Sequence, residues 1–151
     1  MAQSPRGRRT LAAGELFETY LTTRLAADEL LVEVRLPAMP AGCGYAFEEF
    51  ARRHGDFAII GIAAMVVRTG SRCTLARLAT AGAGPVPMRL RDAEAILERD
   101  GLGDAAIQAA AARAAELVTP DSDVHATAAY RRHLTGVLTA RALRRAVERV
   151  R

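Results

Sequence analysis

The 151-residue chain is half apolar, with 5% aromatic residues and no Trp, which indicates one domain, or one domain with a short arm, built on an aliphatic core. All 21 basic residues are Arg, and the formal net charge is +4. Because these Arg residues mostly alternate with Asp and Glu and no recognition motif accompanies them, nucleic-acid binding is not expected despite a pI near 9.8.

Metal binding and membrane insertion are not expected either. The two cysteines, Cys43 and Cys73, form no CxxC pair, and the three histidines are scattered rather than set at ligand spacing. Neither a signal peptide nor a long apolar span is visible. A cytoplasmic protein with two reduced thiols is therefore expected.

Residues 1–37 are expected to form a basic arm followed by a strand. The first ten residues are polar and basic, which is typical of a loose terminus. Residues 30–37 alternate between apolar and charged side chains, which predicts a half-buried strand ended by Pro37. The buried face of that strand would hold Val32, Val34 and Leu36. The main domain is then expected over residues 38–151.

A second strand is expected at residues 45–50. Tyr45 and Phe47 share one of its faces. Phe50 is one position out of step with them, which predicts a bulge or a strong local twist.

Two further strands follow a turn at residues 54–56. The apolar run at residues 57–68 has the length of a strand buried on both faces or of a helix, and its Ile and Val content favours the strand. The next strand, at residues 73–84, ends in small residues that let another backbone or a ligand come close.

The apolar period then changes from two to about 3.6, which predicts helices over residues 91–101, 104–118 and 127–150. Thr127 would cap the last helix, and Val137 belongs to its apolar stripe. Strands followed by helices predict an α+β fold, with a small antiparallel sheet of three to four strands followed by three helices packed against it.

The charged segment Arg52–Asp56 is the candidate for function, and its residues alone leave two interpretations open. Its Gly-Asp pair is typical of a hairpin, so one is a surface turn with solvated Arg side chains, and the other is a functional loop. Elsewhere, Glu48 and Glu49 point to opposite faces of a strand, and the glycine-rich residues 80–85 lack the phosphate-loop pattern. No catalytic or metal-ligating residue is predicted.

Four stretches occur together in an order that resembles a known family. They are DELLVEVRLP (28–37), GYAFEEFARRHGDFAIIGIAA (44–64), GAGPVPMR (82–89) and SDVHATAAYRRHLTGVLTARAL (122–143). From about Leu11 to Val150 the chain is similar to the medium, FAD-binding subunit of the molybdenum hydroxylases, of the carbon monoxide dehydrogenase and xanthine dehydrogenase type. The RRxGDFA and YRRxL patterns carry most of this resemblance.

The resemblance implies that the chain is the C-terminal part of such a subunit, a small sheet with three helices that closes over the flavin, preceded by the last segment of the FAD-binding domain. The glycine-rich loops of that domain, which hold the pyrophosphate, have no counterpart in the sequence. FAD is the implied cofactor, shared with a chain or domain that supplies the pyrophosphate site. Molybdopterin and 2Fe-2S clusters would lie on partners, a large molybdenum subunit and a small iron–sulfur subunit.

The implied cofactor-binding residues are Leu31, Tyr45, Glu48, Arg52, Arg53 and Asp56. Leu31 matches a position that lies against FAD, and Glu48 matches one near the isoalloxazine ring that is often Lys. The implied function is an oxidoreductase subunit, incomplete and inactive alone, that covers FAD and passes electrons from iron–sulfur clusters through FAD to an acceptor. The alternative is a non-catalytic subunit-docking module left by gene splitting or truncation.

Overall fold

The computed structural model describes residues 1–150, which fall into two compact units, residues 1–39 and residues from Pro40 onward. The first unit contains two small antiparallel sheets, with strand orders β2-β1-β5 and β3-β4, and one short helix. Its elements are β1 (Ala2–Ser4), β2 (Gly7–Arg9), α1 (Ala13–Leu16), β3 (Phe17–Thr19), β4 (Thr22–Thr23) and β5 (Leu30–Leu31).

The prediction of a loose arm at the start of the chain is wrong, because β1 and β2 form a hairpin and β5 pairs with the other side of β1. Acidic residues from later in the chain hold the basic side chains of this hairpin. Arg6 lies 2.6 Å from Asp28, and Arg9 lies 2.6 Å from Glu29. Composition alone indicated a loose terminus because these partners are about twenty residues away in sequence.

The predicted strand at residues 30–37 is wrong beyond Leu31. Its partner β1 is three residues long, so the ladder ends after Leu31 apart from two bonds that join Met1 to Val32 and Glu33. The expected apolar face is exposed within the chain, at 47%, 69% and 85% for Val32, Val34 and Leu36. The alternating pattern therefore identified the apolar side chains of this segment correctly. It did not show whether any surface of this unit covers them.

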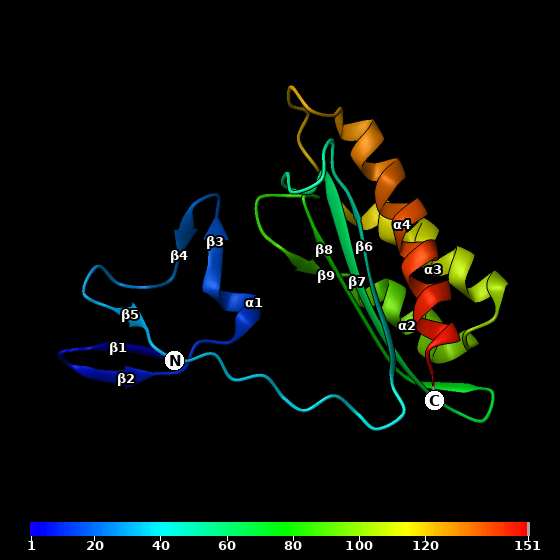
Figure 1. Ribbon diagram of the computed structural model, residues 1–151, viewed down its shortest axis with the longest axis horizontal. Helices are drawn as coiled ribbons and strands as arrows, with labels where there is room; N and C mark the ends of the chain where they lie inside the picture. Colours follow the sequence, from blue (N-terminus) through cyan, green and yellow to red (C-terminus); the bar gives the residue numbers. More distant parts are fainter. Residues whose placement is uncertain (151) are drawn as a thin grey trace. The chain divides into compact units, whose positions relative to one another are not determined.

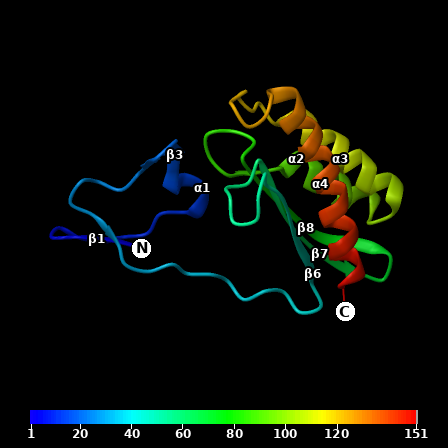
Figure 2. The same ribbon diagram turned by 45° about the horizontal axis from the view of Figure 1, so that its top comes forward.

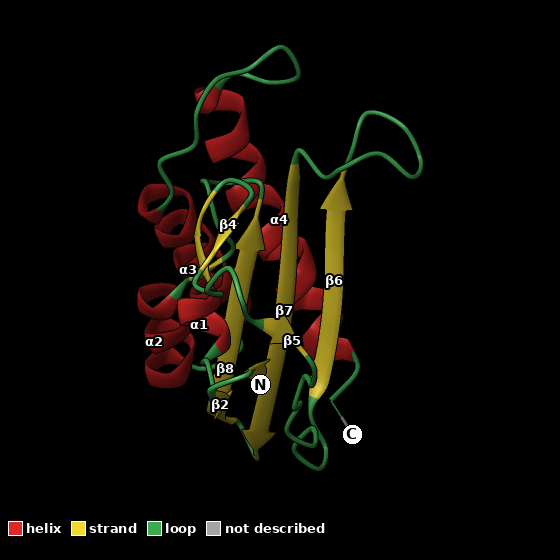
Figure 3. Cartoon of the chain, turned by 90° about the vertical axis from the view of Figure 1, so that its left-hand side faces the viewer, coloured by secondary structure: helices red, strands yellow, loops and turns green. Residues whose placement is uncertain are grey.

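The second unit is an antiparallel sheet with helices on one face, which confirms the predicted α+β class (Figures 1 and 3). The strand order is β6-β7-β8-β9, so each strand pairs with its neighbour in sequence. The strands are β6 (Gly44–Phe50), β7 (Ile60–Thr69), β8 (Arg72–Ala81) and β9 (Met88–Arg89). The helices of this unit are α2 (Arg91–Asp100), α3 (Asp104–Leu117) and α4 (Ala128–Glu148).

The central strand β7 is buried on one face, not on both. Its alternate side chains point to the helices and are at most 3% exposed; they are Ile60, Ile62, Ala64 and Val66. On the other face, Ala63 is exposed. Phe57 is 99% exposed and precedes the strand, because the turn after β6 is longer than the predicted one.

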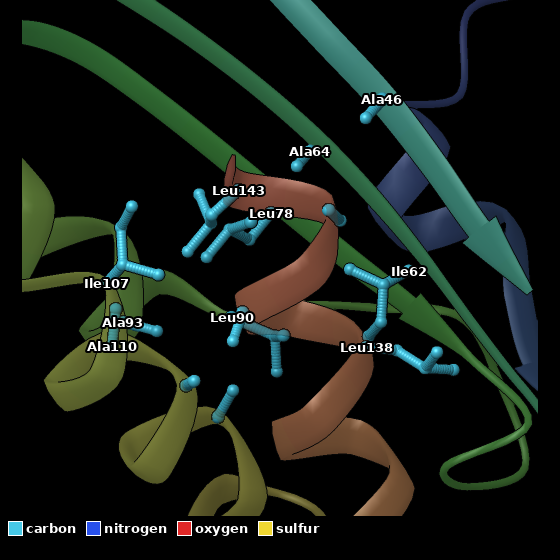
Figure 4. Packing of buried hydrophobic residues seen from close by; sticks show 14 of the residues in the cluster. Ala46, Ile62, Ala64, Leu78, Leu90, Ala93, Ile107, Ala110, Leu138 and Leu143 are labelled. Carbon is cyan, nitrogen blue, oxygen red and sulfur yellow. The ribbon is translucent and has the colours of Figure 1, made fainter. Parts of the chain in front are cut away.

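The core lies between the sheet and the helices and is aliphatic, as the composition predicted (Figure 4). Leu78 of β8 and Leu143 of α4 are fully buried, and Ile107 of α3 is 3% exposed. The outer edge of β8 is covered by glutamates of α2: the backbone N–H of Ala76 donates to Glu98 (2.9 Å), and that of Leu78 donates to Glu94 (2.8 Å). These bonds satisfy an edge that would otherwise be open to another strand.

Of the bulge or strong local twist predicted at Phe50, the bulge is wrong, because β6 and β7 pair without a register shift from Gly44 to Phe50. Phe50 points to the helix side, where its ring meets that of Tyr130 edge-on, with centroids 6.3 Å apart. The side chains of this strand therefore alternate regularly, and Phe50 lies on the face opposite to Tyr45 and Phe47.

The three predicted helices are confirmed to within one or two residues at each end. The hydroxyl of Thr127 accepts a hydrogen bond from the backbone N–H of Tyr130 (3.2 Å), as a helix cap does. Val137 is the exception in the predicted apolar stripe of α4, since its side chain is 40% exposed.

Candidate functional site

The face of the sheet away from the helices, the open face, carries aromatic side chains. Tyr45 and Phe47 of β6 are 55% and 61% exposed, although both are large and mostly apolar. Residues of all four strands line a shallow cavity of about 530 Å³ there. The lining residues of the open face are Tyr45, Phe47, Ala63, Met65, Arg77, Ala79 and Arg89.

Two guanidinium groups beside this cavity are held by glutamates of α2. Arg89 lies 2.6 Å from the buried carboxylate of Glu94, and this hydrogen bond raises the pKa of Arg89. Arg77 lies 3.2 Å from Glu98. The cavity thus combines an aromatic and aliphatic surface with positive charges of fixed position.

Glu48 lies on the opposite side of the same strand. Its side chain is 6% exposed and forms ion pairs with two residues of α4, Arg145 and Arg141. Successive side chains of a strand alternate between faces, so Glu48 cannot share the open face with Tyr45 and Phe47.

The charged loop, residues 51–59, joins β6 to β7 at one end of the sheet. Arg53 and Asp56 lie 3.5 Å apart, and both are well exposed. The guanidinium Nη1 of Arg52 lies 3.2 Å from the Nδ1 atom of His125. The backbone of this segment forms a turn, as one of the two interpretations predicted. Its Arg side chains are not simply solvated, because Arg52 contacts His125 and Arg53 contacts Asp56.

Leu31, the remaining predicted site residue, lies in the first unit. It is the last residue of β5, pairs with Ala2 of β1, and is 48% exposed. Tyr45 thus lies near the start of β6 and the charged loop follows the other end of the same strand, whereas Glu48 faces the helices and Leu31 belongs to the other unit.

Arg131 of α4 is a residue that the sequence did not mark as part of the site. Its side chain is 9% exposed and donates three hydrogen bonds, to the carbonyl oxygens of Ile59 (2.6 Å) and Gly82 (3.1 Å) and to the carboxylate of Asp123 (2.7 Å). These acceptors come from three loops that lie side by side at one end of the sheet (Figures 1 and 2). The YRRxL pattern contained Arg131, but nothing in the sequence showed which loops it joins.

The carboxylate of Asp123 is fixed from several directions. The hydrogen bond from Arg131, with bonds from the backbone N–H groups of Ala126 (2.9 Å) and His125 (2.8 Å), lowers the pKa of Asp123 to about 2. Asp123 is therefore ionised at neutral pH and orders the loop before α4.

Gly82, one of the small residues after β8, allows another segment of backbone to approach closely. Its φ is +78°, and a Cβ atom there would lie 2.4 Å from the carbonyl oxygen of Ile59. The prediction that these residues let a second backbone approach is confirmed, and that backbone is the end of the charged loop.

The open face fits the flavin ring of FAD but not its pyrophosphate. A planar aromatic ring can lie on Tyr45 and Phe47, with exposed apolar side chains around it. A pyrophosphate needs converging backbone N–H groups, commonly at a helix start. The glycine-containing residues 82–87 lead instead to β9, and α2 begins without a side-chain cap.

Residues 1–150 contain no group of three or more His, Cys, Asp and Glu side chains placed to hold a metal ion. In the same residues, no helix has the length and apolar character needed to cross a membrane. Burial raises the pKa of the Cys73 thiol, so this cysteine is a poor nucleophile at neutral pH.

Comparison with solved structures shows the same fold. The chain matches carbon monoxide dehydrogenase from Hydrogenophaga pseudoflava with a TM-score of 0.95 and 34% identity, covering 99% of this chain and 52% of that one. It matches quinoline 2-oxidoreductase from Pseudomonas putida 86 with a TM-score of 0.90 and 31% identity, covering 97% and 51%.

The chain spans about half the length of the curated relatives it matches. It is 38% identical to the alpha subunit of the 6-hydroxypseudooxynicotine dehydrogenase complex of Paenarthrobacter nicotinovorans, covering 99% of this chain and 51% of the relative. It is 33% identical to the carbon monoxide dehydrogenase medium chain of Afipia carboxidovorans, covering 97% and 50%. Residues 45–146 match the family model of the CO dehydrogenase flavoprotein C-terminal domain. The chain therefore belongs to this family, and its homologues are medium, flavoprotein subunits of molybdenum hydroxylases.

Proposed function

We propose that the chain forms the C-terminal part of the flavoprotein subunit of a molybdenum hydroxylase, where it covers FAD. The observation that supports this most is the match to carbon monoxide dehydrogenase along 99% of the chain, with a TM-score of 0.95. Because the chain covers about half of such relatives, the FAD pyrophosphate would be held by a chain or domain equivalent to their other half.

In this proposal FAD, when bound, carries electrons from the iron–sulfur clusters of a small subunit to an acceptor, after substrate is oxidised on a large molybdenum subunit. The residues of this chain bind and orient it. Tyr45 and Phe47 would contact the flavin ring and exclude water from one side of it.

The charged loop would set the electrostatic potential at the flavin edge and limit what approaches it. Arg52 and Arg53 are the positive groups, and Asp56 partly offsets Arg53 at 3.5 Å. Fixed positive charge stabilises a flavin that has gained electrons and negative charge. Glu48 would contribute by fixing β6, because its carboxylate is already paired with Arg145.

The proposal is tested with a fusion flavoprotein, in which the N-terminal half of the Hydrogenophaga pseudoflava medium chain is joined to this chain. We expect it to bind one FAD per chain, measured from the flavin absorbance after gel filtration. Tyr45→Ala with Phe47→Ala should lower the flavin content at least about tenfold, because two stacking contacts are lost. Val137→Ala, an exposed apolar change on the helix side, is the matched control. Flavin content that is equal in all three folded proteins would contradict the proposal.

A further inference from the structure

The charged loop is closed by contacts at its base, outside the charged residues themselves. The backbone N–H of Ile59 donates to the carbonyl oxygen of Phe50 (2.8 Å), which joins the two ends of the loop. The carbonyl oxygen of Ile59 then accepts from Arg131 at 2.6 Å. Gly82 packs directly against this carbonyl, where no larger residue would fit. Arg131 and Gly82 thus both contact the backbone at the end of the loop.

A second path links Arg131 to the loop. Arg131 binds Asp123, and Asp123 accepts from the backbone N–H of His125 at 2.8 Å. The Nδ1 atom of His125 faces Arg52 at 3.2 Å, and it can accept the guanidinium N–H only when it carries no proton itself. A chain of contacts thus runs from Arg131 through Asp123 and His125 to Arg52.

A guanidinium group suits this position. Its fork of donors binds two carbonyl oxygens and one carboxylate at the same time, which a compact ammonium cannot match in the same geometry. Its charge is matched by Asp123, although the side chain is buried.

We propose that Arg131 is a positioning residue for the candidate site: it fixes the charged loop through Ile59 and Gly82, and directs Arg52 through Asp123 and His125. The effect of Arg131 on the flavin, through the position of Arg52, rests on the proposed function. The effect of Arg131 on the position of the loop does not. Arg131 itself would touch neither the flavin nor the electron acceptor.

Limited digestion with trypsin tests the fixing of the loop on the chain as it is, because trypsin cuts after the exposed residues Arg52 and Arg53. We expect Arg131→Met to increase the cleavage rate there about tenfold. Cleavage after Arg68 and Arg72, at the far end of the sheet, should stay at the wild-type rate. Arg132→Met, an exposed neighbour on the same helix, is the matched control and should leave both rates unchanged.

Two results would overturn the positioning role. One is an unchanged cleavage rate after Arg52 and Arg53 in Arg131→Met. The other is a rate that rises equally after Arg68 and Arg72, since that indicates unfolding of the whole unit rather than release of one loop.

The reduction potential of FAD in the fusion flavoprotein tests the link to the flavin. Arg131→Met and His125→Ala should both shift the potential in the same direction as Arg52→Met. His125→Asn should keep the wild-type reduction potential, because the amide oxygen of Asn replaces Nδ1 as the acceptor for Arg52. If the loop is released but Arg52→Met leaves the potential unchanged, the proposed role of the loop at the flavin is wrong and the positioning role of Arg131 stands.

Discussion

Glu48 places a carboxylate between β6 and α4, where a strand side chain is usually apolar. It is 6% exposed and is neutralised by Arg145 and Arg141, which are themselves about half exposed. The sequence showed that Glu48 and Glu49 face opposite ways, but not which of them is buried. The deciding partner, Arg145, is 97 residues further along the chain.

Replacing Glu48 should destabilise the second unit. Glu48→Gln removes the charge that compensates Arg145, and we expect the free energy of unfolding to fall by about 1–3 kcal/mol. Glu49→Gln, on the exposed face, should change it by less than about 0.5 kcal/mol. Urea titration followed by circular dichroism measures both. Equal stability of the two variants would show that the buried ion pair contributes nothing.

Asp123 should make stability depend on pH in the acid range. Its pKa in the folded chain, about 2, is below the ordinary value of 3.8, so the unfolded chain binds more protons between these values. The contribution of Asp123 is therefore complete above about pH 4 and is lost as the pH falls toward 2. The stability difference between the wild type and Asp123→Asn should shrink over this window in urea titrations. A difference that stays constant from pH 6 to pH 2.5 would contradict the assignment.

The positions of the helices and strands in the second unit could be predicted from local sequence patterns. The contacts between these elements could not. The change of apolar period located α2, α3 and α4, and Thr127 marked the start of α4. The predictions for residues 30–37 and for Phe50 are wrong because the apolar period alone does not indicate what lies beside a strand. The charged loop after β6 could be located from the sequence, and its role at the flavin stays a prediction, whereas its link to Arg131 and Asp123 arises only through folding.

Gly44 lies where the backbone of β6 comes very close to the end of α4, and nothing in the sequence indicates this role. A Cβ atom there would lie 1.9 Å from the carbonyl oxygen of Ala146 and 2.8 Å from the backbone nitrogen of Val150. The end of α4 therefore packs on the bare backbone of the strand.

Gly44→Ala should be strongly destabilising, by about 3 kcal/mol or more, because two backbones must move apart. Gly84→Ala is the matched control, since a Cβ atom there would have no neighbour within 4 Å. Thermal unfolding of the two variants checks this. A midpoint for Gly44→Ala equal to that of Gly84→Ala would refute the close packing of β6 and α4.

In the described part of the second unit, the helices cover one face of the sheet and leave the aromatic open face accessible. A monomeric domain gains little from exposing Tyr45 and Phe47 together, so such a surface indicates a binding site. Its form suits a ring, and the described residues provide no cradle for the pyrophosphate.

The chain by itself should accordingly bind FAD weakly or not at all. Contacts to one side of the ring replace only part of what a complete pocket provides. Isothermal titration calorimetry of the chain with FAD should give no saturable heat at micromolar concentrations. Tight binding of one FAD per chain would show that the site is complete within this sequence.

The proposed function requires that this chain covers a flavin which receives electrons from partner subunits. It is tested most directly by assembling the fusion flavoprotein with the large and small subunits of the Hydrogenophaga pseudoflava carbon monoxide dehydrogenase and adding carbon monoxide without oxygen. We expect the flavin absorbance to bleach after the iron–sulfur clusters are reduced. An assembly that forms without flavin, or whose clusters are reduced while the flavin stays oxidised, would contradict it, and the first result would favour a docking module instead.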